Sequence, residues 1–441
     1  MKLFFLSLGC DKNLSDSEHM LKLIADAGFE LTDDEAEADI AVINSCSFIG
    51  DAKKESIAEI LRLASYKKKG RLKVLIVAVC LSERYGDQFE ELLPEVDGIL
   101  GTASWDRIVS VIEDALSGKR PKALLQKDRL PDLRERILTT GGHYAYLKIA
   151  EGCDKACTYC IIPYLRGPYR SIPEEALLEE AETLVNGGVR ELILVAQETT
   201  RYGVDLYGEK RLPQLLKKLA AIPELVWIRI LYTYPEEITD ELVEVIRTEE
   251  KVVKYLDIPV QHASDTILRR MGRRTTRAGI EERIRKIREA VPDIVLRTTL
   301  ITGFPGETEE DVQELLDFTA ANRFDRLGVF CYSREEGTAA AGMKEQVPQR
   351  VKKKRRDAVM ALQQQIAFED AKKRVGSVLR CMVEGRLSDE PDTYAARSEM
   401  DAPDVDGYVF FHSDTELMSG SFVDIRITAS HEYDLIGEMT E

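Results

Sequence analysis

The sequence contains no apolar run of 18 or more residues, so it predicts no transmembrane helix. Its start, MKLFFLSLGCDKN, has a short apolar run but no small-residue cleavage site, and we interpret the run as a buried strand, not a secretory signal. Basic residues are outnumbered by acidic ones: the 441 residues include 61 Lys and Arg and 78 Asp and Glu. The net charge of −17 is unusual for a protein whose main partner is nucleic acid. We therefore expect a cytoplasmic protein, without a membrane partner, that binds a small molecule or a basic protein.

Histidine is scarce as well, with five residues at positions 19, 143, 262, 412 and 431. None of them stands at the short ligand spacing that zinc sites usually show. Cysteine is better represented, with eight residues, and a reducing compartment would keep them from forming disulfides. The spacing of the cysteines is therefore the stronger guide to their chemistry.

The pattern of the chain divides it into several segments and indicates an α/β protein. Residues 1–118 alternate apolar runs with helical patterns, which predicts an N-terminal parallel α/β domain. After a polar linker at 119–142, residues 143–348 repeat the alternation and predict a partial TIM-type (βα)6 barrel. A helical connector at 349–375 leads to short alternating strands in 376–441, which are typical of a small antiparallel β-barrel.

The sequence also predicts individual elements. Ser15 and Glu18 have the spacing of a capping box at the start of the first helix. The expected strands of the central barrel are residues 144–150, 191–196, 226–231, 255–258, 295–301 and 326–330.

Three cysteines, Cys153, Cys157 and Cys160, form the pattern C-x3-C-x2-C in the loop after the first predicted barrel strand. Three thiolates this close together can ligate three irons of one cubane and leave the fourth iron open for substrate. A structural zinc usually takes four protein ligands, so a zinc completed by a distant residue is the weaker alternative. The spacing resembles the signature of the radical S-adenosylmethionine (SAM) superfamily, in which SAM chelates the open iron. Tyr159, before the last cysteine, also fits that pattern and is expected at the cofactor.

Further candidate contacts lie just past the predicted strand ends, where barrel enzymes place their sites. We expect Gln261, Arg297 and Gly303 to contact SAM. A glycine at such a position lets the backbone approach a ligand closely, although a tight turn explains it equally well. His262 is either a structural histidine or a substrate contact.

A second group of cysteines, Cys10, Cys46 and Cys80, is spread over the N-terminal domain. Each follows an apolar strand by one or two residues, and parallel strands end along one edge of their sheet. We therefore expect the three sulfurs to converge there and to hold a second iron–sulfur cluster with one open iron. Buried free cysteine is the alternative for each residue alone, and it is our interpretation of Cys331 and Cys381, which lack such partners.

Five motifs resemble the radical SAM methylthiotransferase family, and the likeness spans essentially the whole chain. The family also shares the order of the domains, with a TRAM domain as the C-terminal barrel. One branch of the family modifies an adenosine in transfer RNA, and the other modifies an aspartate of small-subunit ribosomal protein S-twelve. The exact residues of two motifs, LGCDKN and PVQH, resemble those of the ribosomal-protein branch. The motifs are SLGCDKN at 7–13, NSCSFI at 44–49, GCDKACTYC at 152–160, LDIPVQH at 256–262 and GFPGET at 303–308.

The resemblance implies methylthiolation of an aspartate β-carbon by radical chemistry, with two 4Fe–4S clusters and two SAM molecules per turnover. It also implies an electron donor such as flavodoxin or ferredoxin, and a sulfur donor. Charge favours the protein substrate over transfer RNA, because residues 375–441 hold four Arg, no Lys and fifteen Asp and Glu. A transfer-RNA methylthiotransferase and a metal-stabilised binding protein without catalysis are the alternatives.

Overall fold

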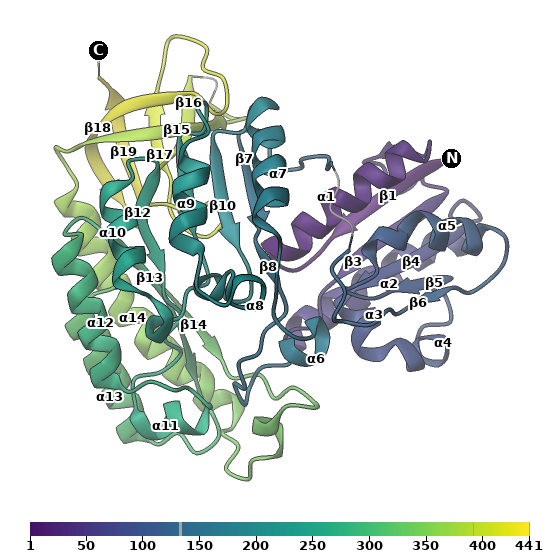
Figure 1. Cartoon of the computed structure of the whole chain (residues 1–441), viewed down its shortest axis with the longest axis horizontal. Coiled ribbons are helices and arrows are strands. Elements are labelled where there is room, and N and C mark those ends of the chain that lie inside the picture. Colours follow the sequence, from purple (N-terminus) through teal and green to yellow (C-terminus); the bar gives the residue numbers. More distant parts are fainter. Residues whose placement is uncertain (132–134, 391, 441) are drawn as a thin grey trace.

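The computed structural model describes residues 1–131, 135–390 and 392–440, and Figure 1 shows them as three joined parts. The N-terminal part lies to one side of a central part, and a small barrel covers one end of the centre. The fold class predicted from the sequence is confirmed: a parallel α/β domain, an open six-stranded sheet and a closed β-barrel. No helix in the described residues is long and apolar enough to cross a membrane.

The N-terminal part is a parallel sheet in the order β2-β1-β3-β4-β5-β6. Strands β3 and β4 read IAVINS and VLIVAV and are buried throughout, as expected for parallel strands covered on both faces. Strand β6 lies inside the segment expected to be a linker, so the sheet extends into that segment. The strands are β1 (Lys2–Ser7), β2 (Glu30–Thr32), β3 (Ile40–Ser45), β4 (Val74–Val79), β5 (Gly98–Leu100) and β6 (Lys122–Ala123). The helices are α1 (Asp11–Asp26), α2 (Gly50–Lys68), α3 (Cys80–Tyr85), α4 (Phe89–Leu92) and α5 (Ile108–Leu116).

Helix α1 begins earlier than the capping-box spacing predicted. Its N-cap is Cys10, so Ser15 lies inside the helix. The Glu18 carboxylate instead accepts a hydrogen bond from the Thr139 backbone N–H at 2.8 Å. The capping-box prediction was therefore wrong, because the helix starts at Asp11 and Glu18 contacts the linker segment instead.

The central part is a parallel sheet in the order β7-β10-β11-β12-β13-β14, with each strand beside its neighbour in sequence. This is the expected open (βα)6 barrel. Its strands are β7 (Tyr144–Lys148), β10 (Glu191–Val195), β11 (Trp227–Ile230), β12 (Val252–Asp257), β13 (Val295–Thr302) and β14 (Arg326–Cys331). Its helices are α6 (Ile162–Arg166), α7 (Glu174–Asn186), α8 (Val204–Tyr207), α9 (Leu212–Ala220), α10 (Asp240–Thr248), α11 (Asp265–Arg270), α12 (Arg277–Ala290), α13 (Glu309–Asn322) and α14 (Gln349–Lys373). A small hairpin pairs β8 (Ala150–Glu151) with β9 (Arg170–Ser171).

Helix α14, which the sequence suggested to be a connector, also packs on the barrel. The Gln363 amide donates to the Phe324 carbonyl at 2.7 Å, and Lys352 Nζ donates to the Tyr332 carbonyl at 2.7 Å. The helix thus follows β14 as the outer helix of the sixth βα unit.

The C-terminal barrel closes through the order β15-β16-β17-β19-β18. Four of its five strand pairs are antiparallel, but β17 and β19 pair in parallel, which corrects the expectation of an all-antiparallel barrel. The strands are β15 (Val378–Arg386), β16 (Thr393–Ser398), β17 (Val409–His412), β18 (Phe422–His431) and β19 (Asp434–Met439).

The two barrels share one hydrophobic core. Tyr144, Ile193 and Trp227 of the large barrel pack with Cys381 and Phe411 of the small one. The small barrel therefore closes the end of the large barrel at which the parallel strands start, as Figure 1 shows. The carboxyl ends of the strands, where barrel enzymes place their chemistry, lie at the other end.

Buried charges reinforce this junction. Glu191 accepts hydrogen bonds from Arg229 at 2.7 Å and from Arg397 at 2.8 Å, and Arg397 also donates to Glu384 at 2.6 Å. We call Glu191, Arg229, Glu384 and Arg397 the Glu191 network. Its members join β10 and β11 of the large barrel to β15 and β16 of the small one.

Candidate active site

The structure brings Cys10, Cys46 and Cys80 to one edge of the N-terminal sheet. Cys10 caps α1 after β1, Cys46 follows β3, and Cys80 begins α3 directly after β4. The sulfurs of Cys10 and Cys80 lie 4.0 and 3.8 Å from the same Asn13 Oδ1. A Cβ placed on Gly9 would come within 3.4 Å of the Cys46 sulfur, so only a glycine lets the Cys10 loop approach so closely.

Backbone strain accompanies this arrangement. Val79 has φ +72°, a left-handed conformation that is costly for a β-branched residue. It is the last residue of β4, directly before Cys80, and it turns the chain abruptly from strand to helix. Strain of this kind persists where the surrounding structure over-determines it, often at functional sites.

Asn13 connects the three cysteine-bearing loops. Its side-chain Nδ2 donates to the Leu8 carbonyl at 3.0 Å and to the Ser45 carbonyl at 3.1 Å, next to Cys10 and Cys46. The amide is thereby oriented with Oδ1 toward the sulfurs of Cys10 and Cys80. No pattern in the sequence predicted this role, although Asn13 lies within the SLGCDKN motif at 7–13.

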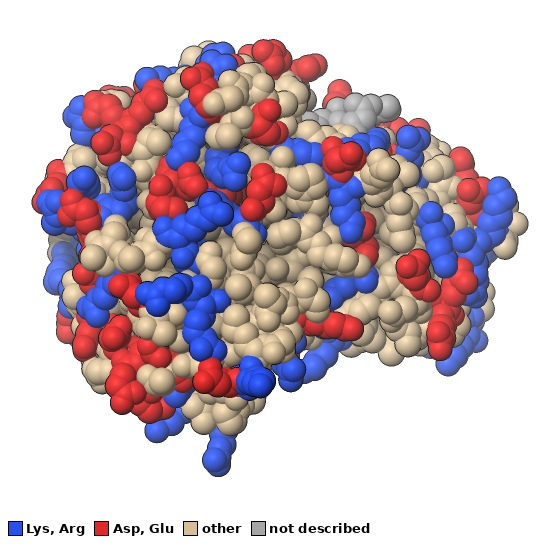
Figure 2. All heavy atoms as spheres, turned by 60° about the horizontal axis from the view of Figure 1, so that its bottom comes forward, with Lys and Arg blue, Asp and Glu red and all other residues tan. Residues whose placement is uncertain are grey.

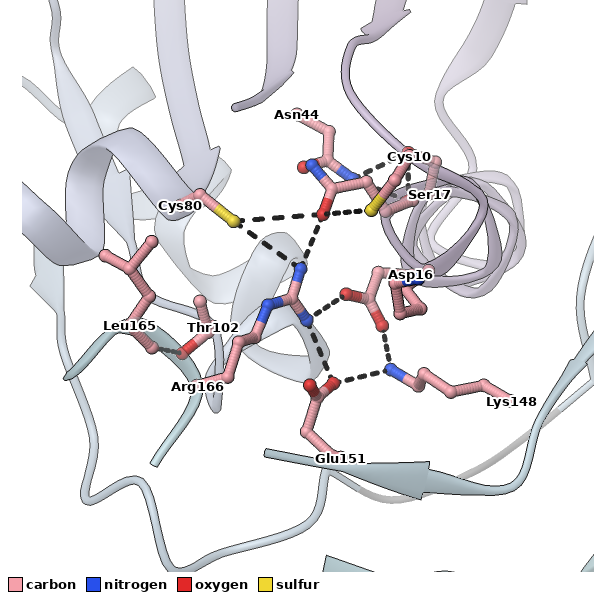
Figure 3. A network of polar contacts seen from close by, with 12 residues as sticks. Cys10, Asp16, Ser17, Asn44, Cys80, Thr102, Lys148, Glu151, Leu165 and Arg166 are labelled. Atoms are coloured by element: carbon pink, nitrogen blue, oxygen red, sulfur yellow. Dashed lines mark hydrogen bonds and ion pairs between the residues drawn. The ribbon is translucent and has the colours of Figure 1, made fainter. Parts of the chain in front are cut away.

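A buried network of charges adjoins Cys10 and Cys80 (Figure 3). Arg166, from α6, donates to Asn13 Oδ1 at 2.5 Å and to the Cys80 sulfur at 3.6 Å. The same guanidinium pairs with Asp16 and with Glu151, at 2.9 Å each. Lys148 completes the set by pairing with both carboxylates. We call Asp16, Lys148, Glu151 and Arg166 the Arg166 network; it joins α1 of the N-terminal part to the first strand and cluster loop of the barrel.

Electrostatics favour the charged forms of Glu151 and Lys148 despite their burial. Burial alone would raise the pKa of Glu151, but Arg166 and Lys148 outweigh it and hold that pKa below its ordinary value. Burial would likewise lower the pKa of Lys148, and Asp16 and Glu151 reverse the shift. The site therefore contains two fixed carboxylates and two fixed cations within a water-poor junction.

The second triad lies in the loop between β8 and α6. The Cys160 backbone N–H donates to the Cys157 carbonyl at 3.0 Å, and the Cys153 N–H donates to the Gly167 carbonyl at 3.1 Å. The Lys155 N–H points at the Cys153 sulfur at 3.4 Å. The loop therefore folds back on itself and brings the three cysteines together.

The thiols of both triads fit iron–sulfur ligation. Burial raises the pKa of Cys153 to about 11, and the pKa values of Cys160 and Cys80 to about 12. Thiols in this state give up their protons when iron binds. Among the described residues, no three His, Cys, Asp or Glu side chains are arranged to hold a single metal ion. A cubane differs from a single ion because each thiolate binds its own iron.

Two buried polar atoms between the triads have no hydrogen-bond partner among the described residues. Gln197 donates to Glu151 at 2.8 Å, but its own Oε1 is buried without a hydrogen bond, and so is Oε2 of Glu198. Burial raises the pKa of Glu198 to about 7, opposed by Lys155, whose ammonium lies 3.5 Å away. Buried acceptors of this kind fit a ligand that carries donor groups, as the amino and hydroxyl groups of SAM do.

The four expected SAM contacts have different surroundings. Tyr159 is partly buried beside Met271 and Phe304. Gln261 has φ +73° and pairs through its backbone with β13. Arg297 lies 3.7 Å from Asp257 inside the barrel.

Gly303 and His262 already have partners within the protein. The Gly303 N–H donates to Glu307 at 2.7 Å, and an added Cβ would lie 2.2 Å from Lys352. His262 contacts Glu307 through Nε2 at 3.2 Å and accepts from the Ser264 N–H through Nδ1, which favours the structural interpretation of this histidine. Contact of Tyr159, Gln261, Arg297 or Gly303 with SAM stays a prediction.

Comparison with known families identifies the three parts of the chain. The radical SAM superfamily matches residues 147–319, the Uncharacterized protein family UPF0004 matches residues 2–101, and the TRAM domain matches residues 375–440. The ribosomal protein uS12 methylthiotransferase RimO of Lachnoclostridium phytofermentans is 58% identical over 99% of each chain. The enzyme of that name from Acetivibrio thermocellus is 50% identical over 99% of this chain and 98% of its own. The chain belongs to the RimO methylthiotransferase family.

As a member of this family, the chain is a radical SAM methylthiotransferase that uses SAM and two 4Fe–4S clusters, as the motifs predicted. Solved structures support the fold alone. The radical SAM methyltransferase TsrM from Kitasatospora setae superposes with a TM-score of 0.55 at 13% identity, covering 89% of this chain and 80% of TsrM. The cobalamin-dependent enzyme OxsB superposes with a TM-score of 0.53 at 15% identity, covering 77% of this chain and 54% of OxsB.

Proposed function

We propose that this protein adds a methylthio group to the β-carbon of an aspartate in ribosomal protein uS12, with two SAM molecules consumed per turnover. The relatives named above support the substrate, since uS12 is the small-subunit protein S-twelve expected from the motifs. The observation that carries the proposal is the pairing of two three-cysteine groups across the Arg166 network. Each group leaves one iron of a cubane without a protein ligand.

In this proposal, Cys153, Cys157 and Cys160 hold the cluster that binds SAM, and Cys10, Cys46 and Cys80 hold the auxiliary cluster. The cofactors, when bound, supply the reductive cleavage of SAM and the delivery of sulfur, which no side chain could perform. The chain itself holds both sets of thiolates, orients the ligands and excludes water. An electron donor such as flavodoxin or ferredoxin, and a sulfur donor, complete the requirements.

Surface charge offers two different faces to a ribosomal substrate. Some acidic groups of the C-terminal barrel are used internally: Glu384 pairs with Arg397, and Asp401 pairs with Arg326. Others, such as Asp414, are exposed and suit a basic protein. The internal pairs mean that the sequence count overstates the acidity of this surface.

A basic rim lies at the carboxyl end of the large barrel. Arg270 of α11 lies against Gly306, and Arg355 of α14 donates to the Glu307 carbonyl at 3.0 Å. The two helices therefore flank the loop that contains Gly306 and Glu307. Near them, the exposed side chains of Arg269, Arg274, Lys353 and Lys354 form no ion pair with the described part of the chain. Figure 2 turns this end forward and shows Lys and Arg side chains beside an uncharged hollow. The rim fits the RNA phosphates that surround a ribosomal protein.

The decisive experiment offers the reconstituted enzyme three substrates: purified uS12, assembled small subunits and transfer RNA. Mass spectrometry of tryptic peptides and of nucleosides then locates any methylthio group. We expect modification of the uS12 aspartate and none of transfer RNA. Modified adenosine with unmodified uS12 would instead assign the chain to the transfer-RNA activity, and a colourless anaerobic sample without iron would contradict both.

A further inference from the structure

Arg166 reaches from one cysteine group to the other. It lies six residues after Cys160 at the end of the same loop, yet its guanidinium contacts Asn13 and Cys80 in the N-terminal part. Only 2% of the residue is exposed. One segment of 14 residues, 153–166, therefore carries all three thiols of the barrel site and a hydrogen-bond donor to a thiol of the auxiliary site.

The burial of this cation calls for a reason beyond stability. A buried ion pair is seldom better for stability than well-packed apolar residues, because its desolvation offsets the attraction. Here two carboxylates compensate Arg166, and a second cation, Lys148, compensates those carboxylates in turn. Such an arrangement keeps the guanidinium charged and fixed while one of its N–H groups points at sulfur.

A fixed cation that donates an N–H to a ligand sulfur acts on an iron–sulfur cluster in a known direction. Hydrogen bonds to the sulfurs and nearby charge are among the determinants of cluster potential. Reduction adds negative charge, which a cation stabilises, so the contact with Cys80 raises the reduction potential. Arg166 donates to Asp16, Glu151, Asn13 and Cys80 at the same time, which is one contact more than the three N–H groups of a lysine can make.

We propose that Arg166 is a positioning residue that couples the two cysteine sites. It raises the reduction potential of the auxiliary cluster through the Cys80 sulfur, and it fixes that cluster against the barrel through Asn13 and Glu151. The inference rests on the proposed assignment of Cys10, Cys46 and Cys80 as cluster ligands, but it does not depend on the identity of the macromolecular substrate.

The test measures the potential of each cluster separately in the full-length chain. A variant with Cys153, Cys157 and Cys160 all changed to Ala retains only the auxiliary cluster, and a variant with Cys10, Cys46 and Cys80 changed to Ala retains only the barrel cluster. Arg166→Gln and Arg166→Lys are placed in both backgrounds, and iron per chain and midpoint potential are measured by anaerobic titration with electron paramagnetic resonance. Arg229→Gln is the matched control, since it removes a buried arginine from the Glu191 network, which contacts no cysteine of either triad.

We expect Arg166→Gln to lower the auxiliary midpoint while the barrel midpoint stays in place, and Arg229→Gln to move neither. Arg166→Lys retains the positive charge but loses the planar guanidinium. The midpoint potential of its auxiliary cluster should therefore lie between those of the parent and the Gln variant. If Arg166→Gln loses its iron, the test rests on Arg166→Lys, whose auxiliary midpoint should then lie below that of the parent. An auxiliary midpoint equal to that of the parent in every variant that retains iron would overturn the proposal. Absence of iron from the parent auxiliary variant would instead contradict the ligand assignment.

Discussion

Two buried networks join the large barrel to its neighbours, and they differ in what they contact. The Glu191 network and the Arg166 network each balance two carboxylates with two cations. The first joins two barrels that already share a hydrophobic core. The second donates directly to a cysteine sulfur and adjoins acceptors without partners, such as Gln197 Oε1.

The difference separates structural charge from functional charge within one chain. At the C-terminal junction the charges fix the orientation of two packed barrels, and removing them should affect stability. At the N-terminal junction the same kind of pairing places a cation beside Cys80, a proposed ligand of the auxiliary cluster, and removing it should affect chemistry. Burial and pairing alone do not distinguish the two cases; the contact with sulfur does.

The largest effect should come from the cysteines on either side of the Arg166 network. We expect Cys157→Ala to reduce 5′-deoxyadenosine formation to background, because the barrel cluster would lose a ligand. Cys46→Ala should retain much of that cleavage and lose the methylthio product. Both products can be measured by liquid chromatography with mass spectrometry on anaerobic samples of known iron content. Equal loss of cleavage in the two variants, with the barrel cluster present in both, would contradict the division of roles.

The Glu191 network should show its role in stability. Glu191→Gln removes the carboxylate partner of the buried Arg229 and leaves Arg397 with Glu384 alone, which should cost about 3–5 kcal/mol. Burial opposes ionisation of Glu191, but Arg397 and Arg229 outweigh it and lower its folded pKa below 4.5. Its stabilisation is therefore complete above the unfolded pKa and is lost as the pH falls from about 4.5 through the folded pKa.

Trp227 packs on Phe422 at this junction, so its fluorescence reports the unfolding there when the other tryptophan, Trp105, is changed to Phe in every variant. The parent should lose stability more steeply than Glu191→Gln below pH 4.5. An identical pH slope for Glu191→Gln and the parent would show that the Glu191 pairs add nothing to stability.

The sequence predicted the strands and both cysteine groups because those signals are local. Runs such as VLIVAV are apolar and end at a cysteine, and parallel strands end along one edge. The networks escaped prediction because their pairs are distant in sequence, as with Lys148 and Asp16, which are 132 residues apart. The capping-box prediction for Ser15 and Glu18 was wrong for the same reason, because Glu18 accepts a hydrogen bond from Thr139, far along the chain. Charged residues inside buried strands, the lysine of YAYLK and the arginine of WIRI, were the local hints of such networks.

The Cys10 loop provides a test of the geometry of the auxiliary site. Gly9 and Gly28 both have positive φ values, +101° and +85°, but only at Gly9 would a Cβ meet other atoms, at 3.0 Å from Cys46 Cβ. Gly28→Ala should cost only the conformational strain of about 1–2 kcal/mol. Gly9→Ala carries that strain and also displaces Cys46. In the background that retains only the auxiliary cluster, iron per chain should fall for Gly9→Ala and stay at the parent level for Gly28→Ala. Full iron in both would show that the loop tolerates the displacement.

The smallest effect should appear at the basic rim, where charges are exposed and screened by salt. Changing Arg269 and Arg274 to Glu should lower kcat/KM on assembled small subunits by roughly threefold to tenfold and reduce its salt dependence, because phosphate contacts are lost. The rate on purified uS12 should change little. The control is Lys217→Glu with Arg247→Glu, on α9 and α10, which alters the net charge equally away from the loop that the rim flanks. Equal losses of kcat/KM on free uS12 and on small subunits would show that the rim contacts the protein substrate instead of RNA. An equal loss in the control variant would show that net charge, not the position of the rim, causes the effect.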